Sequence, residues 1–218
     1  TRQLHQLVGD AAFRKRQWPA VQDTYGVLLA MAPTDIGERI LYSHRLAFAA
    51  EKNGDQAMAL ATIWPLMPIL SSSQQPSLVD EQLRIAMLRQ YADLSEKSGD
   101  IVNAAQALDA LASENALPVA QRADASYRAG ELYRRSDNLD EAQRALEAAL
   151  RLAEAHLPAL DALEQICKQR NDDERLATIL GRKVAATAKH PQRQKPLLTR
   201  LAELQLQLGR PDVADQTF

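Results

Sequence analysis

The chain has 218 residues, of which 46% are hydrophobic and 25% charged. These values are those of an ordinary globular protein and exclude a disordered or fibrous chain. Only 5% of the residues are aromatic, and Ala and Leu dominate the apolar set, which favours close helix packing over a twisted sheet. The formal net charge is -2, with Lys and Arg spread along the chain, which argues against a nucleic-acid partner. We therefore predict an all-α protein.

The cysteine content and the chain ends constrain the setting of the protein. Cys167 is the only cysteine, which excludes an intrachain disulfide and a cysteine-based zinc site. No apolar run approaches the roughly 20 residues of a transmembrane helix, so we expect no membrane insertion by this segment. The chain begins at Thr1 without a methionine, and the last expected helix is incomplete at Phe218. We therefore expect a fragment of a larger protein, with the choice between cytoplasm and periplasm left open.

A turn recurs along the chain and divides it into units. Each copy has Gly, Asn or Asp at its centre, or Arg in the first copy, and a new apolar-periodic segment follows it. The central residues are Arg16, Gly54, Gly99, Asp137, Asn171 and Gly209, 34 to 45 residues apart. Gly, Asn and Asp tolerate a left-handed backbone, which closes one helix and turns the chain into the next. The pattern predicts helical hairpins.

Capping residues and prolines mark the expected helix ends. Asp100, Asp140 and Asp172 follow three of the turns, and a short acidic side chain there accepts the free amides of a helix start. Prolines are expected between units, where a helix must stop or start; they are Pro33, Pro118, Pro158 and Pro196.

The longest step between turns contains the most hydrophobic segment, residues 63–70. In one interpretation, Trp64 and Leu70 seal the gap between the second and third units. In the other, residues 71–77 form a projecting loop and the apolar segment is an edge where a partner docks. The sequence leaves both open.

Sequence motifs of catalysis or metal binding are missing. The four histidines lack the i, i+4 spacing of a helical zinc site, and no glycine-rich phosphate loop or nucleophile elbow is present. Cys167 is expected to be a buried structural thiol. We therefore expect no enzyme activity, no cofactor and no metal.

The stretch from Ala123 to Pro158 resembles a tetratricopeptide repeat. Gly130 stands at the small-residue position of the first helix, Tyr133 matches the family aromatic, and Ala142 and Ala149 match the second-helix alanines. The first unit repeats parts of this pattern with Gly9, Trp18, Tyr25 and Pro33. Two residues depart from the pattern. Ser126 stands where the family has Trp, and Glu164 stands at the small-residue position of the fifth unit.

This resemblance implies a right-handed superhelical solenoid of antiparallel helix pairs with about five and a half repeats. The expected units are residues 2–36, 37–75, 79–117, 119–156, 157–191 and 194–218, the last one truncated, in a single array. Steps longer than 34 residues leave room for a related, looser α-solenoid. Small residues would let neighbouring helices approach closely; they are Gly9, Ala47, Ala92, Gly130 and Ala202.

The resemblance also implies a function. First helices of tetratricopeptide stacks line a concave groove that binds a peptide or helix of another protein, and the stack itself is not catalytic. The residues that we expect in this groove are Arg14, His44, Phe48, Arg89, Asp93, Tyr127, Glu131 and Arg134. The Lys and Asn set that holds a terminal carboxylate in chaperone-binding relatives is missing. A monomeric scaffold is the leading hypothesis; the alternatives are a self-assembling solenoid and a regulatory arm of a larger enzyme or polysaccharide-export protein.

Overall fold

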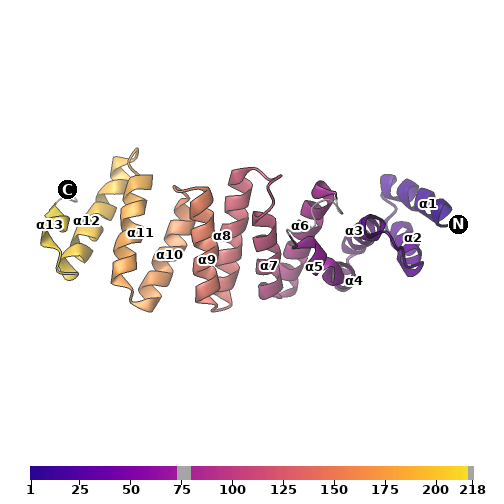
Figure 1. Cartoon of the computed structure of the whole chain (residues 1–218), viewed down its shortest axis with the longest axis horizontal. Coiled ribbons are helices and arrows are strands. Elements are labelled where there is room, and N and C mark those ends of the chain that lie inside the picture. Colours follow the sequence, from indigo (N-terminus) through magenta and orange to yellow (C-terminus); the bar gives the residue numbers. More distant parts are fainter. Residues whose placement is uncertain (73–79, 216–218) are drawn as a thin grey trace. The chain divides into compact units, whose positions relative to one another are not determined.

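The computed structural model describes residues 1–72 and 80–215, and every element in these ranges is helical (Figure 1). Contacts divide the chain into two compact units, Thr1–Ala116 and Leu117–Phe218. The elements of the first unit are α1 (Arg2–Arg14), α2 (Trp18–Ala30), α3 (Ile36–Lys52), α4 (Gln56–Ile63), the 3-10 turn η1 (Trp64–Leu66), α5 (Met67–Leu70), α6 (Glu81–Ser98) and α7 (Ile101–Ala112). Those of the second are α8 (Val119–Arg135), α9 (Leu139–Leu152), α10 (Leu157–Arg170), α11 (Asp173–Ala186), α12 (Pro191–Gln207) and α13 (Pro211–Asp215). The predicted all-α class is confirmed.

All six predicted turn centres adopt the left-handed conformation. Their φ angles are positive, from 54° at Asn171 to 84° at Gly54 and Gly99. In each turn, the amide that follows the centre donates to the carbonyl five residues earlier, at 2.8–3.0 Å. The six bonds are Gln17 to Ala12, Asp55 to Ala50, Asp100 to Ser95, Asn138 to Tyr133, Asp172 to Cys167 and Arg210 to Gln205. This bond is characteristic of the Schellman motif at a helix C-terminus. The first helix of each of the six hairpins therefore ends in the same way.

The helix starts are partly as predicted. Asp100 and Asp172 are N-caps, since each side chain accepts the backbone amide three residues on. The expectation for Asp140 is wrong, because α9 begins at Leu139 and Asn138 occupies the cap position. The Asp140 carboxylate accepts instead from Arg170 of α10, at 2.5 Å. Because Asp140 lies inside the first turn of α9 and not at the cap position, its side chain can reach Arg170.

Prolines punctuate the helices at three of the four expected places. Pro33 lies between α2 and α3, Pro118 is the N-cap of α8, and Pro158 lies in the first turn of α10. The expectation for Pro196 is wrong, because it lies inside α12. Pro191 already begins that helix, and its fixed φ and missing amide suit the first helical position.

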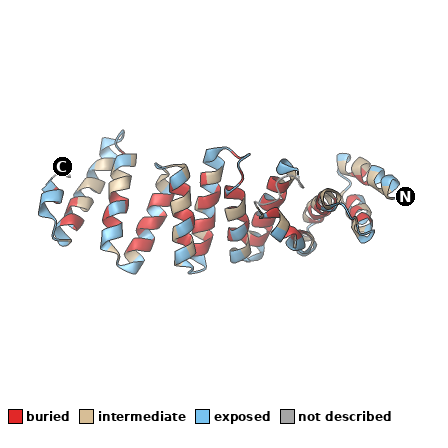
Figure 2. Ribbon diagram, viewed as in Figure 1, coloured by how far each residue is buried: buried red, intermediate tan, exposed pale blue. Residues whose placement is uncertain are grey.

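Small residues are buried where hairpins pack. The five predicted ones, Gly9, Ala47, Ala92, Gly130 and Ala202, are all buried. Buried residues recur along the helices of both units (Figure 2). A Cβ on Gly9 would lie 2.9 Å from the ring of Tyr25, and one on Gly130 would lie 2.6 Å from Cγ of Leu146. In both hairpins the second helix therefore approaches the first one closely, which only glycine allows without rearrangement.

The apolar segment of the longest step is mostly internal. Leu66 and Leu70 are 1% exposed and Ile63 is fully buried, whereas Trp64 is 55% exposed. Leu70 is thus internal, whereas Trp64 is half-exposed and packs against Tyr91 of α6. The projecting loop proposed for residues 71–77 and the helix end at Phe218 lie largely outside the described residues. No helix within the described ranges is both long and apolar enough to cross a membrane.

Candidate functional site

The first helices of the first compact unit lie next to one another. Tyr42 of α3 donates to the Gln6 side chain of α1 at 3.1 Å, and Gln90 of α6 donates to Glu51 of α3 at 2.9 Å. Lys97 also pairs with Glu51 at 3.6 Å. Side chains from α1, α3 and α6 consequently form consecutive rows on this unit.

Phe48 belongs to an aromatic cluster of Phe13, Trp18, His44 and Phe48. The rings of Phe13, Trp18 and Phe48 lie 5.5–5.6 Å from one another, centroid to centroid. The guanidinium of Arg45 covers the Phe13 ring at 3.8 Å. Aromatic pairs at this spacing add to stability beyond their buried area, so Phe48 is half-buried in a packed group and not a free-standing anchor.

His44 lies at the edge of this cluster, with its ring 6.2 Å from that of Phe48. Burial, with the nearby positive charge of Arg45, lowers its pKa to about 4. Its Nδ1 atom is buried without a hydrogen-bond partner among the described residues. His44 is therefore a neutral, packed imidazole at physiological pH.

Arg14, Arg89 and Asp93 are the exposed members of the predicted set in this unit. Arg14 ends α1, and its Nε donates to the Asp10 carbonyl at 3.3 Å. Arg89 and Asp93 lie one turn apart on α6 and both reach solvent. These three charged side chains lie at the surface of the first unit.

In the second unit, Tyr127, Glu131 and Arg134 share one face of α8. Arg134 donates to both oxygens of Glu131, at 3.1 and 2.9 Å, and this hydrogen bonding raises the pKa of the guanidinium. The Tyr127 ring packs 5.2 Å from that of His156, and burial raises the phenol pKa. His156, for which the sequence predicted no role, accepts the Ala159 amide at Nδ1 and caps α10.

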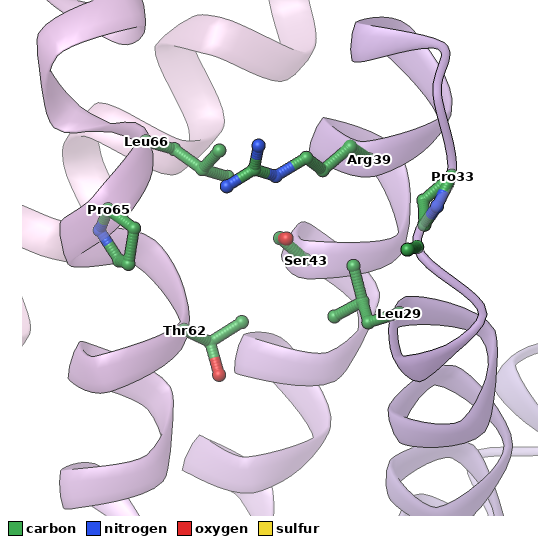
Figure 3. A pocket seen from close by; sticks show the side chains of 8 residues that line it. Leu29, Pro33, Arg39, Ser43, Thr62, Pro65 and Leu66 are labelled. Atoms are coloured by element: carbon green, nitrogen blue, oxygen red, sulfur yellow. The ribbon is translucent and has the colours of Figure 1, made fainter.

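The structure brings His44 and Phe48 into contact, and likewise Glu131 and Arg134. It places five of the eight predicted residues in the first unit and three in the second. None of the eight lines either of two surface pockets in the first unit. One lies between α2, α3 and η1 (Figure 3), and the other lies beside Trp64, which stacks on Tyr91 at 6.3 Å. No sequence motif pointed to these pockets.

A buried ionic group ties α10, α11 and α12 together. Glu164, 4% exposed, accepts from Lys183 and Arg200, both at 2.5 Å, and from Lys168 at 2.7 Å. Lys183 also pairs with Asp161 at 2.6 Å. Burial alone would raise the Glu164 pKa, but the hydrogen bonds and charges of the cations outweigh it and lower the pKa to about 2. The charge at the fifth small-residue position is thus compensated.

The described residues include one buried thiol and no cluster of metal-binding side chains. Cys167 is 4% exposed, and burial raises its pKa, as expected of a structural thiol. Within residues 1–72 and 80–215, no three His, Cys, Asp or Glu side chains lie together in a way that would hold a metal ion.

Comparison with known proteins agrees with the geometry. The sequence model of the tetratricopeptide repeat matches residues 123–156, which span α8 and α9. No curated protein matches the chain by sequence.

Crystal structures extend the likeness to the whole chain. A tetratricopeptide repeat protein from Parabacteroides merdae is 16% identical, with 99% of this chain and 77% of that one covered and a TM-score of 0.52. The MamA protein is 14% identical, with 88% and 94% covered and a TM-score of 0.53. At such low identity, this likeness concerns the fold. Repeats of this type generally mediate protein–protein interactions and are typically non-catalytic. Residues 123–156 thus match the tetratricopeptide repeat, and the chain has the helical-repeat fold of tetratricopeptide repeat proteins.

Proposed function

We propose that the chain is a non-catalytic scaffold that holds a peptide or helix of a partner protein against its first helices. The contact residues proposed for the first unit are Arg14, His44, Phe48, Arg89 and Asp93. Those proposed for the second unit are Tyr127, Glu131 and Arg134. The partner is another protein, and the scaffold itself is a monomer.

One observation carries this proposal. Consecutive first helices of the first unit are joined by side-chain hydrogen bonds, Gln6 with Tyr42 and Glu51 with Gln90. Their outward side chains therefore lie in adjacent rows, the arrangement that an extended partner segment needs for contact with several repeats at once. Exposed charges and half-buried aromatic rings along these rows provide both orientation and contact area.

The experiment is a pull-down with the purified chain, followed by quantitative binding of the partner it identifies. The double variant Arg89→Glu, Tyr127→Ala should lose the partner while its thermal midpoint shows that it remains folded. A matched control, Arg151→Glu with Val102→Ala, changes exposed positions on second helices and should bind normally. Equal binding by both double variants would contradict the proposed face.

A specific observation also favours self-association as a second candidate. Leu4, Leu7 and Val8 form a stripe on α1 and are 59%, 65% and 53% exposed. Such a stripe on a helix of a repeat stack suits packing against another helix. Sedimentation over a range of concentrations separates the candidates: the scaffold stays monomeric, whereas a self-assembling chain grows and reverts to monomer in the variant Leu7→Glu.

A further inference from the structure

The pocket between α2, α3 and η1 combines apolar walls with hydrogen-bond donors. Its volume is about 390 Å³, within the range of small-molecule sites. The apolar walls come from Leu29, Pro33, Pro65 and Leu66, with Pro33 and Pro65 on opposite sides (Figure 3). A ligand that fills it must therefore present an apolar body.

Arg39 is the only charged residue among those that line this pocket. Its side chain extends across the pocket toward Leu66 (Figure 3). Of the neighbouring carboxylates, Glu38 pairs with Arg2 and Asp35 caps α3. The Arg39 guanidinium makes no ion pair with a described residue, so its donors remain available to an incoming anion.

The two hydroxyl groups of the pocket differ in what they offer. Thr62 already donates to the Met58 carbonyl at 2.7 Å. Ser43 is only 4% exposed, and its hydroxyl makes no hydrogen bond to another described residue. Its hydroxyl lies in the pocket beside the path of Arg39 (Figure 3). A buried hydroxyl donor beside a guanidinium suits an oxygen anion.

Backbone strain occurs at the rim of the same pocket. Ala32 has a φ of 47°, a left-handed conformation in which a Cβ is disfavoured. It lines the pocket together with Pro33. Strain of this kind persists where the surroundings fix the chain, and such positions gather at ligand sites.

From these observations we propose that this pocket binds a carboxylate joined to a short aliphatic body. Arg39 and Ser43 donate hydrogen bonds to the carboxylate, and Leu29, Leu66 and the two prolines contact the aliphatic part. A free aliphatic acid and an acidic side chain next to an apolar residue in a partner protein share this chemistry. The pocket does not include any first-helix residue of the proposed partner face, so either proposal can fail alone.

The test is an amide NMR titration of the whole chain, observed at Ser43, Thr62 and Leu66. Octanoate carries both features, octanol lacks the charge and acetate lacks the aliphatic body. The peptides acetyl-Leu-Glu-Leu-amide and acetyl-Leu-Gln-Leu-amide form a second matched pair. Octanoate, or the Glu peptide, should give saturable shifts at these amides, at least about tenfold tighter than its neutral counterpart, because one charge-assisted interaction is lost.

Variants and salt then test the role of each group. Arg39→Gln should weaken binding of the anion about tenfold, while Arg151→Gln, the same change on α9, should leave it unaltered. Raising NaCl to 1 M should weaken octanoate but not octanol, since exposed charges are screened. Tighter binding of the peptide than of octanoate assigns the ligand to a partner protein, and the reverse assigns it to a free acid.

Three results would overturn the proposal. They are the absence of a saturable shift with either anionic probe, equal affinities of octanol and octanoate, and unchanged affinity in folded Arg39→Gln protein. The salt dependence of the unmodified chain decides the matter if Arg39→Gln fails to fold.

Discussion

Nζ of Lys183 lies 2.5 Å from Oε2 of Glu164, inside a helix packing region where the other first helices carry Gly or Ala. The second oxygen of Glu164 faces Arg200 and Lys168. Three helices of the second unit therefore meet at one carboxylate. The other repeats pack through small apolar residues at this position, whereas the fifth repeat packs through compensated charges. Its stability depends on keeping these charges paired.

Removal of the Glu164 carboxylate should destabilise the second unit strongly. Glu164→Ala leaves Lys183, whose side chain is 12% exposed, with Asp161 as its remaining partner. We expect a loss of about 2–3 kcal/mol, near the range for breaking a buried pair. The free energy of unfolding in urea measures it. Glu174→Gln removes the exposed partner of Arg210 and should cost less than about 0.5 kcal/mol; equal losses in the two variants would refute the distinction.

The same group should make stability depend on acid pH. The Glu164 pKa is lowered from 4.5 to about 2 in the folded protein. A lowered folded pKa stabilises the protein above the ordinary value, and the contribution disappears as pH falls from about 4.5 towards 2. Linkage gives about 3 kcal/mol for a shift of this size. Unfolding of the parent chain and of Glu164→Gln should be compared from pH 7 to pH 2. Their stability difference should stay constant above about pH 5.5 and narrow below it, and a difference that is constant throughout would contradict the assignment.

The features that could be predicted from the sequence, above all the turns, depend on local backbone chemistry. Each turn centre is Gly, Asn or Asp, except Arg16, and its left-handed conformation follows from that residue type and the spacing. The N-cap of α9 was predicted at the wrong residue because Asn138 and Asp140 lie close together and Asn and Asp are equally favoured at an N-cap. Pro196 misled because a proline within the first turns of a helix resembles a proline at its start.

The remaining features depend on residues distant in sequence. Glu164 was recognised as a departure from the repeat, but its partners Lys183 and Arg200 lie 19 and 36 residues away and follow no motif. The pocket around Arg39 and Ser43 depends on η1, an irregular turn in the longest step. The packing of Phe48 against Phe13 and Trp18 could not be predicted for the same reason, since these two residues come from other helices.

Gly130 should tolerate no side chain. In Gly130→Ala the new Cβ would lie 2.6 Å from Cγ of Leu146, and 3.2 Å from the Ala142 carbonyl oxygen. We expect a loss of about 1–3 kcal/mol from overpacking, and a larger loss in Gly130→Leu. Thermal unfolding measures both.

The control for this substitution is Gly181, which lies inside α11 with open space around its Cβ position. Gly181→Ala should stabilise the protein by about 0.5–1 kcal/mol, because Ala favours the helix. Truncation of Leu146 to Ala should reduce the penalty of Gly130→Ala in a double-mutant cycle. Independent effects of the two changes would show that the Leu146 contact is not the cause.

Introducing glycine at one turn centre and removing it from another should have opposite effects on stability. Arg16 has a φ of 57° and Gly54 one of 84°, and the same closing bond follows each of them. A side chain in the left-handed region costs about 1 kcal/mol, although glycine loses more conformational freedom on folding. Arg16→Gly should therefore raise the free energy of unfolding by about 0.5 kcal/mol, and Gly54→Ala should lower it by about 1 kcal/mol. Urea unfolding measures both, and hydrogen exchange of the Gln17 and Asp55 amides locates the change. Destabilisation by both substitutions would mean that the Arg16 side chain stabilises its turn through contacts that outweigh backbone strain.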